Sequence, residues 1–164
     1  MNRILRTVHH AIARRLYPGG RPSSIARALN RVAARHHARG VLTDRASATL
    51  IVAGRRTGRT IAVAVAVAEV SGDDYLVSML GETADWVRNV RAAHGRAVLV
   101  RHRQRRQVRL REVPVDERAP ILQSYLDVAP GARPHLGVDR SEPLESFARI
   151  AGDFPVFLVC PDAE

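Results

Sequence analysis

The most regular pattern in the chain is a strict alternation over residues 61–68, IAVAVAVA. Isoleucine and valine take every second position and alanine takes the positions between them, which is the two-residue period of a β-strand with two different faces. A short β-branched run at residues 49–52 precedes it, and Gly54 and Gly58 bracket a basic segment between the two runs. The pattern predicts a β-hairpin with a basic turn at residues 54–59.

The remaining elements follow from the same periodicities and from breaks at glycine and proline. Strands are predicted at residues 75–80, 97–103, 107–113 and 154–159, and helices at residues 84–93, 116–128 and 141–151. Residues 104–106 are predicted to form the turn between the second and third of these strands. With 164 residues, of which 46% are hydrophobic, the chain is long enough to bury a core and is expected to form one such domain.

Residues 1–41, which we call the basic arm, differ in charge from the rest of the chain. They hold nine of the 26 arginines and none of the 16 acidic residues, so they carry +9 and the remainder carries +1. Apolar residues at helical spacing predict two amphipathic helices, separated by Pro18 and the two glycines that follow it. Such a segment suits an anionic lipid surface. Packing of the arm on its own domain, with a solvated basic face, is the alternative.

The arm is not expected to cross a membrane. The longest apolar run in the chain is the eight-residue stretch 61–68, whereas a helical span needs about 20 apolar residues. The single cysteine, Cys160, excludes an internal disulfide and fits a reducing compartment. We therefore expect a cytoplasmic protein whose arm makes a peripheral contact with the inner face of the plasma membrane.

The basic turn has the composition of an anion-binding loop. Arg55, Arg56 and Arg59 supply forked donors that suit phosphate or carboxylate groups, and the glycines let backbone N–H groups approach a ligand. The alanine face of the strand beyond the turn would leave a flat space for a planar ring. A solvated hairpin tip and a tightly packed barrel interior are the alternative interpretations.

The only tryptophan lies in a second candidate segment. Trp86 and Asn89 are three residues apart in a predicted helix, so they share a face just beyond a strand that ends near Gly81. An aromatic ring and an amide near a helix N-terminus suit a planar anionic ligand. A core anchor and a local cap are the alternative roles.

Three motifs, in this order and spacing, resemble the deazaflavin-dependent nitroreductase family: the turn GRRTGR with its alternating strand, the strand GDDYLVSMLG and the helix DWVRNVRAAHG. The similarity covers residues 49–161. It implies an α+β fold in residues 42–164, namely a split β-barrel of the FMN-binding, flavin-reductase type with peripheral helices and the N-terminal helical arm. It also implies coenzyme F-420, an 8-hydroxy-5-deazaflavin, as the cofactor, with FMN as the alternative.

The resemblance assigns the cofactor-binding residues by position. The turn would hold the phosphate and polyglutamate tail through Arg55, Arg56, Thr57, Gly58 and Arg59. The deazaflavin ring would be lined by Ala64, Val65, Ser78, Met79, Leu80, Gly81, Trp86 and Asn89. With these roles the protein would be an oxidoreductase that passes a hydride from reduced coenzyme F-420 to an unsaturated acceptor such as a quinone or an enone.

Two departures from the family limit what transfers. The family often has a further arginine and a proline in the second hairpin strand, where this chain has Ile61 and Ala64. Its nitroreductases also carry tyrosines in the loop before the last strand, whereas residues 129–136 contain none. Activity on nitro compounds is therefore not expected to transfer, and the basic arm points instead to a lipophilic acceptor reached at a membrane surface.

In a hydride-transfer enzyme the cofactor carries the redox chemistry and the protein supplies position and a proton. Ser78 is the first candidate for a proton donor and His135 the second. No metal site is expected, because the seven histidines form no ligand pattern. For the oligomeric state, the sequence is compatible with both a monomer and a homodimer.

Two other functions stay open at this point. One is a non-catalytic split-barrel protein that binds a deazaflavin, FMN or haem. The other is an Arg-rich nucleic-acid-binding protein, suggested by the basic hairpin around residues 104–106. The near-neutral charge of residues 42–164 makes nucleic acid the weaker of these partners.

Overall fold

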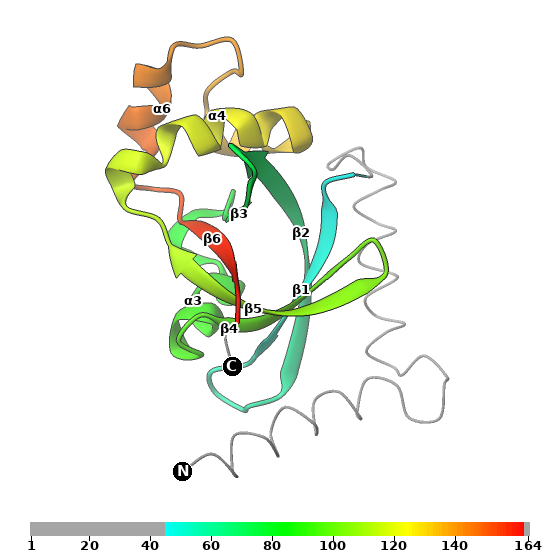
Figure 1. Ribbon diagram of the computed structural model, residues 1–164. Coiled ribbons are helices and arrows are strands. Elements are labelled where there is room, and N and C mark those ends of the chain that lie inside the picture. Colours follow the sequence, from blue (N-terminus) through cyan, green and yellow to red (C-terminus); the bar gives the residue numbers. More distant parts are fainter. Residues whose placement is uncertain (1–44, 163–164) are drawn as a thin grey trace.

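In the computed structural model, which describes residues 45–162, six antiparallel strands close into a barrel (Figure 1). The strands are β1 (Ser47–Ala53), β2 (Thr60–Val70), β3 (Asp73–Val77), β4 (Arg96–Arg101), β5 (Gln104–Glu112) and β6 (Val156–Pro161). Their order around the barrel is β1-β2-β3-β6-β5-β4, and β4 pairs with β1 to complete the circle. The expected antiparallel barrel of the α+β class is confirmed, whereas the basic arm and its boundary lie outside the described residues.

The alternation along β2 separates two hydrophobic layers. Val65 and Val67 belong to the apolar cluster inside the barrel, whereas Ala66 and Ala68 belong to a second cluster outside it. Alanine at these outward positions lets a helix approach the sheet closely, because its side chain is only a methyl group. The expected flat space on the alanine face is therefore filled by the protein itself at Ala66 and Ala68, and the alanines do not form the barrel interior.

One end of the barrel is closed by α3 (Asp85–Ala92), which follows the short 3-10 helix η2 (Gly81–Thr83). Val87 and Val90 of this helix are fully buried in the same cluster as the inward side chains of the strands. The connection from β3 to β4 passes through this helix, since the two strands are not neighbours in the barrel. The segment that carries Trp86 and Asn89 is thus fixed by core packing.

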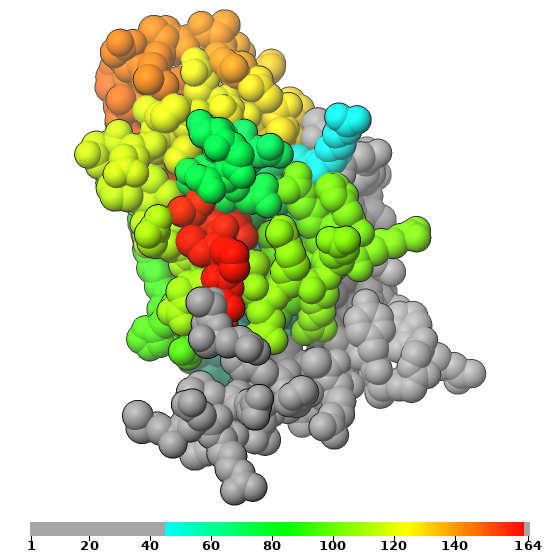
Figure 2. Space-filling view, in the orientation of Figure 1, coloured from blue at the N-terminus to red at the C-terminus, as the bar shows by residue number. Residues whose placement is uncertain are grey.

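The long connection from β5 to β6 forms a helical layer. It contains η3 (Val115–Glu117), α4 (Ala119–Val128), η4 (Pro130–Ala132), α5 (Arg133–Leu136) and α6 (Leu144–Ile150). Buried side chains of α4 pack on the outer face of β2 and β3. This layer, yellow to orange in Figures 1 and 2, lies at the opposite end of the barrel from the β1–β2 turn.

Three predicted elements differ from the structure. The strand predicted at residues 75–80 is β3, which begins at Asp73 and ends at Val77, so residues 78–80 lie in a loop. The turn of the second hairpin lies at His102 and Arg103, not at residues 104–106, and Arg101 pairs directly with Gln104. Both turn residues have positive φ angles, 50° and 62°, so they form a two-residue loop that allows pairing to continue up to the tip. The helix predicted at residues 116–128 is divided at Arg118 into η3 and α4.

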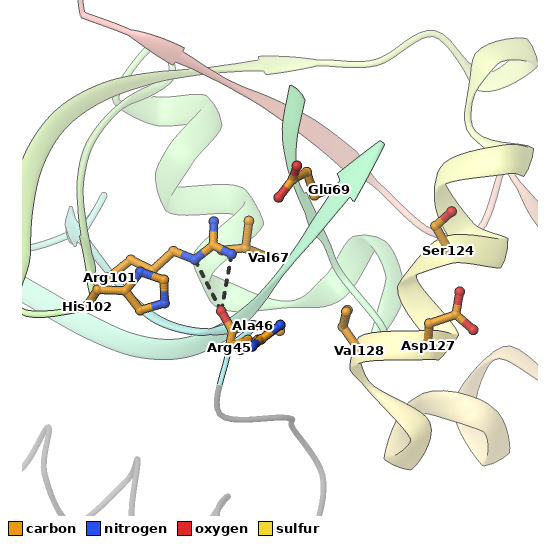
Figure 3. Close-up of a pocket in the computed structure, with 9 residues that line it drawn as sticks. All are labelled: Arg45, Ala46, Val67, Glu69, Arg101, His102, Ser124, Asp127 and Val128. Carbon is orange, nitrogen blue, oxygen red and sulfur yellow. Dashed lines mark hydrogen bonds between the residues drawn. The ribbon is translucent and has the colours of Figure 1, made fainter. Parts of the chain in front are cut away.

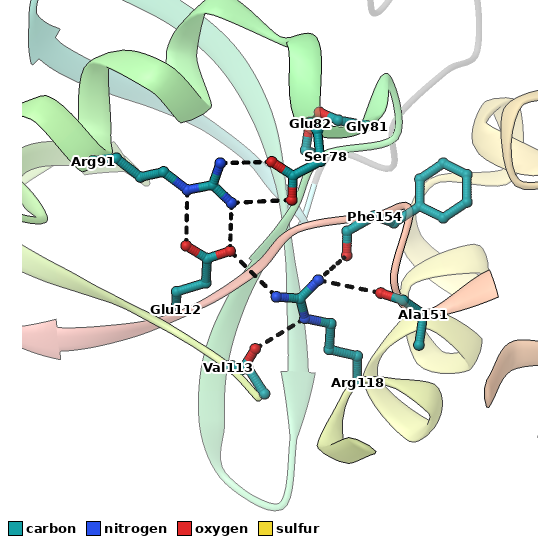
Figure 4. Close-up of polar contacts among 9 residues, drawn as sticks. All are labelled: Ser78, Gly81, Glu82, Arg91, Glu112, Val113, Arg118, Ala151 and Phe154. Atoms are coloured by element: carbon teal, nitrogen blue, oxygen red, sulfur yellow. Dashed lines mark hydrogen bonds and ion pairs between the residues drawn. The ribbon is translucent and has the colours of Figure 1, made fainter. Parts of the chain in front are cut away.

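Arg118, the residue at which the predicted helix is divided, has a buried guanidinium group (Figure 4). The Arg118 side chain is 5% exposed, and its Nε donates to Val113 O at 2.9 Å. Its Nη1 donates to the carbonyl oxygens of Ala151 and Phe154, both at 3.2 Å, and its Nη2 lies 3.2 Å from Glu112 Oε1. One side chain therefore links the end of β5, the end of α6 and the segment that enters β6.

Replacing Arg118 tests this link. We expect Arg118→Met to lower the free energy of unfolding in urea by about 3–5 kcal/mol, because it leaves three carbonyl groups without their buried donor and removes one of the two guanidinium groups that donate to Glu112. Arg118→Lys should recover part of the loss. Arg133→Met, at an exposed arginine 3.8 Å from Asp139, is the matched control and should change stability little. An unchanged unfolding free energy in Arg118→Met would contradict this role.

Candidate functional site

The basic turn between β1 and β2 is a closed loop held by its own backbone. Gly54 N donates to Arg59 O and Gly58 N donates to Gly54 O, both at 2.8 Å. Gly58 has a φ angle of +64°, a conformation that side chains other than glycine rarely adopt. The turn therefore has a defined shape, with the three arginines that were predicted to bind an anion distributed around it.

Asn89 of α3 holds Arg55 from both its backbone and its side chain. Asn89 Oδ1 accepts from Arg55 N at 3.1 Å and from Arg55 Nη1 at 3.0 Å. The remaining terminal nitrogen, Arg55 Nη2, lies 2.9 Å from Asp85 Oδ1 at the start of the same helix. The structure thus brings together two predicted site residues that are 34 positions apart in sequence.

The amide nitrogen of Asn89 is an unused donor next to this contact. Asn89 is 1% exposed, and its Nδ2 has no hydrogen-bond partner within residues 45–162. A buried donor without an acceptor costs free energy, so its acceptor is expected to be a group other than residues 45–162, and a bound ligand is one such group. Together with the arginines of the turn, it fits a cofactor that carries anionic groups and carbonyl oxygens.

Arg56 and Arg59 lie on the exposed side of the turn. In the described part of the chain neither guanidinium forms an ion pair, and Thr57 Oγ1 accepts from Arg59 N at 3.4 Å. These two side chains therefore have no carboxylate partner within residues 45–162, whereas Arg55 is paired with Asp85. The sequence alone did not separate these two roles.

The loop of residues 78–81 is fixed by hydrogen bonds at both ends. Ser78 N donates to Pro155 O at 2.9 Å, and the Ser78 hydroxyl donates to Gly81 O at 2.8 Å. Gly81 has a φ of +74°, and a Cβ atom there would lie 3.1 Å from Asp153 O. Because Ser78 is 1% exposed and its proton is already shared with Gly81, the structure gives no independent support for its role as a proton donor.

Met79 and Leu80, the middle residues of this loop, differ in environment. Met79 packs against the cluster under the helical layer. Leu80 is 61% exposed, which is unusual for a large apolar side chain. Leu80 therefore offers an apolar contact beside the loop that was predicted to line the cofactor.

A charged network supports the same loop from behind (Figure 4). Arg91 of α3 donates to both oxygens of Glu82, at 2.6 and 3.1 Å, and to both oxygens of Glu112, at 2.9 and 2.6 Å. Since Glu112 also accepts from Arg118, the network connects η2, α3, β5 and the helical layer. The hydrogen bonds that Arg91 donates to Glu112, and then those to Glu82, raise the pKa of Arg91 above its usual range, and the hydrogen bond from Arg91 lowers the pKa of Glu82.

The other predicted ring-lining residues lie in different surroundings. Trp86 packs on Phe157 of β6, with ring centroids 5.5 Å apart, at the end of the barrel core. Ala64 and Val65 are neighbours on β2 and point to opposite faces, so at most one of them can touch a given ring through its side chain. His135 is exposed on α5 in the helical layer. Its role stays a prediction, like those of the other assigned residues.

A cavity of about 450 Å³ lies at the helical-layer end of the barrel, away from the turn (Figure 3). It is lined by Arg45, Ala46, Val67, Glu69, Arg101, His102, Ser124, Asp127 and Val128, and by none of the residues predicted to bind the cofactor. Arg101 is already bound to Asp74 Oδ1 and to Arg45 O, and the acidic groups of Glu69 and Asp127 would repel an anion. The cavity therefore gives no support for an anionic cofactor there, and the turn and α3 stay the predicted position of the cofactor.

The basic β4–β5 hairpin is partly neutralised. Arg101 and Arg106 both pair with Asp74, and Arg109 pairs with Asp162. Arginines that are engaged in this way have less to offer a phosphate backbone, so the structure gives little support to nucleic-acid binding. Among the described residues, no group of three or more metal-ligating side chains could hold a metal ion, and no helix is long and apolar enough to cross a membrane.

Comparison with known proteins identifies a family. A family model described as F420H(2)-dependent quinone reductase matches residues 26–144, well over half of the chain. No curated protein matches the sequence.

Solved structures show the same fold at low sequence identity. An F420-H2 dependent reductase, FDR-A, is 19% identical over 72% of this chain and 96% of its own, with a TM-score of 0.52. A protein described as a domain-swapped dimer is 18% identical over 81% of this chain and 94% of its own, also with a TM-score of 0.52. Atu2129 of Agrobacterium tumefaciens, described as of unknown function, is 13% identical over 78% of this chain and 55% of its own, with a TM-score of 0.53. The split-barrel fold expected from the motifs is thereby confirmed.

The lowered pKa of Glu82 gives a prediction about pH. The Glu82–Arg91 contact stabilises the fold fully above the pKa that Glu82 has in the unfolded chain, and this contribution is lost as pH falls through the lower pKa of the folded state. Wild type should therefore be more stable than Glu82→Gln at pH 7, and the difference should shrink towards pH 3 when urea unfolding is followed across this range. Glu145→Gln, at an exposed position of α6, is the control. A wild-type advantage that does not change with pH would contradict the assignment.

Proposed function

Because this chain belongs to the family of quinone reductases that use reduced coenzyme F-420, we propose that it carries out hydride transfer to a lipophilic quinone where the β1–β2 turn meets α3. The observation that carries this placement is the contact of Arg55 with Asn89, a buried residue whose amide nitrogen still lacks an acceptor. Among the described residues, the buried side-chain polar atoms without a hydrogen-bond partner are Ser47 Oγ and Asn89 Nδ2, and of these two residues only Asn89 contacts an arginine of the turn.

The side chains around the turn would divide the work of binding. Arg56 and Arg59, both exposed, would hold the anionic phosphate and tail through charge-assisted hydrogen bonds. Arg55 and Asn89 would fix the orientation of the turn against α3. The loop 78–81, held by Gly81 and by the Glu82–Arg91 contact, would then present a fixed wall to the ring.

When bound, reduced coenzyme F-420 supplies the hydride, and the protein needs no metal for that step. Reduction of a quinone to a hydroquinone also takes up a proton. The Ser78 hydroxyl could release its proton only by giving up its bond to Gly81 O, so Ser78 acts in this proposal chiefly by shaping the loop. Solvent at the open rim of the turn can supply the proton without a dedicated side chain.

Leu80 supports an apolar acceptor. Its exposed side chain projects from the loop assigned to the ring and would cover apolar parts of a quinone. The tyrosines that the resembled nitroreductases carry before the last strand are absent here, since residues 129–136 contain none. We therefore assign quinones, and not nitro compounds, as the acceptor class of this site.

Paired double variants test the function. Wild type should bind oxidised coenzyme F-420 saturably, measured by quenching of Trp86 fluorescence and by calorimetry, and should oxidise the reduced form when menadione is added. Arg56→Ala with Arg59→Ala should weaken binding at least tenfold, because each lost charge-assisted bond costs about 1.5–3 kcal/mol when fully formed. Arg103→Ala with Arg105→Ala, at the exposed tip of the β4–β5 hairpin, changes the net charge equally and should leave binding unchanged.

The outcomes separate the alternatives. Binding without turnover on any quinone would favour a non-catalytic carrier. Preference for FMN over coenzyme F-420 would contradict the cofactor assignment. Equal weakening of binding in the two double variants would show that overall charge, and not the turn, attracts the cofactor.

The basic arm carries a further part of the proposal, namely that the protein works at the inner face of the plasma membrane. Its support is the charge of +9 on residues 1–41 and the apolar positions at helical spacing. Deleting residues 1–20, which hold four of the nine arginines, should weaken sedimentation with vesicles rich in phosphatidylglycerol, and raised salt should weaken binding of the full chain. Vesicles of phosphatidylcholine alone are the control, and vesicle binding that the deletion leaves unaltered would contradict the proposal.

A further inference from the structure

Arg55 is held by two contacts of different character. The contact with the buried Asn89 is itself partly buried, and both the backbone and the side chain of Arg55 take part in it. The contact with Asp85 lies at the rim, where the Asp85 side chain is 77% exposed and engages only Arg55 Nη2, at 2.9 Å. The first contact fixes the arginine, and the second can be exchanged at little cost because exposed ion pairs contribute little to stability.

Asp85 presents to Arg55 what an anionic ligand would present. A carboxylate and a phosphate group both offer oxygen acceptors that fit the forked donors of a guanidinium group. Within residues 45–162, Arg56 and Arg59 form no ion pair, so Arg55 is the one arginine of the turn whose charge is already met by a carboxylate. In the folded protein the carboxylate of Asp85 is thus the counter-ion of Arg55.

We propose that Asp85 sets the affinity of the site by occupying the place on Arg55 that the phosphate of the cofactor takes over. The proposal rests on the function proposed above and adds a residue that competes with the ligand. On binding, Arg55 keeps its hydrogen bonds to Asn89 while its Nη2 exchanges the Asp85 carboxylate for a phosphate oxygen. Asp85 then becomes a repulsive neighbour of the bound anion, which weakens binding and speeds release.

A purely structural role for Asp85 predicts a different effect of its removal on ligand affinity. Asp85 is the first residue of α3, where a negative charge interacts favourably with the helix dipole. Its removal would then lower stability slightly and would not improve ligand binding. Competition predicts that the same substitution lowers stability slightly and increases affinity.

The first experiment measures the affinity of Asp85→Asn for oxidised coenzyme F-420 by calorimetry. We expect binding roughly two- to fivefold tighter than in wild type at low salt, because the ligand no longer displaces an ion pair of the strength usual at exposed sites. The gain should decrease at high salt. Asp127→Asn is the matched control, since Asp127 forms an exposed pair with Arg140 at 2.7 Å on the helical layer, and it should leave the affinity unchanged.

A double-mutant cycle with Arg55 decides the cause. In an Arg55→Ala background, Asp85→Asn should lose most of its effect, because the competition acts through Arg55. Weaker binding in Asp85→Asn, or an equal gain with and without Arg55, would overturn the proposal.

A second probe keeps this test separate from the function itself. Inorganic pyrophosphate should also bind more tightly to Asp85→Asn than to wild type. If pyrophosphate shows this gain but coenzyme F-420 does not bind, Asp85 competes for anions at the turn and the assigned cofactor is wrong. If coenzyme F-420 binds and neither probe responds to Asp85→Asn, the cofactor assignment stands and the role of Asp85 is refuted.

Discussion

The carboxylate of Glu112 is the group on which the arrangement of this protein depends. It stands at the end of β5 and accepts hydrogen bonds from Arg91 of α3 and from the buried Arg118. A single carboxylate shared by two guanidinium groups connects the helix that closes the barrel with the layer that covers its outer face. Since Arg91 also holds Glu82, the shape of the loop before α3 depends on a residue that was not among those predicted to bind the cofactor.

The helices at the two ends of the barrel consequently have different structural roles. At one end α4 buries the alanine face of β2, and this close packing needs small side chains at Ala66 and Ala68, while α6 packs on α4. At the other end α3 closes the interior with Val87 and Val90 while its polar face meets the basic turn. Helix α3 is therefore both a core element and the support of the site, which ties the geometry of binding to the stability of the barrel.

Much of the fold could be predicted because its strands and helices follow from the local periodicity of apolar residues. The alternation in β2 located a strand and its two faces correctly, and glycine marked the ends of the basic turn. The turn between β4 and β5 was predicted at the wrong residues, because His102 and Arg103 adopt positive φ angles that neither residue type signals. The division at Arg118 was missed for a similar reason, since a buried arginine looks the same in sequence as an exposed one.

The residues of the candidate site could be predicted from the sequence, but the hydrogen bonds and ion pairs between them could not. The motifs brought Arg55 and Asn89 into one list, yet only the structure shows that one holds the other and that Asp85 completes the contact. The bonds of Arg91 join residues 9 and 21 positions away in sequence, and no periodicity records such separations. Long-range pairing of charges depends on how the barrel closes, which no short stretch of sequence contains.

Closure of the barrel also limits how this protein can associate with others. Each of the six strands has a hydrogen-bonded neighbour on both sides within residues 45–162. The pairing is partial along some strands, since β2 pairs with β1 over Thr60–Ala66 and with β3 only over Val67–Val70. Another chain that extended this sheet would find only such short stretches to pair with. Association through the barrel must then rely mainly on side-chain surfaces, or two copies must exchange whole strands, which requires the barrel of each to open first.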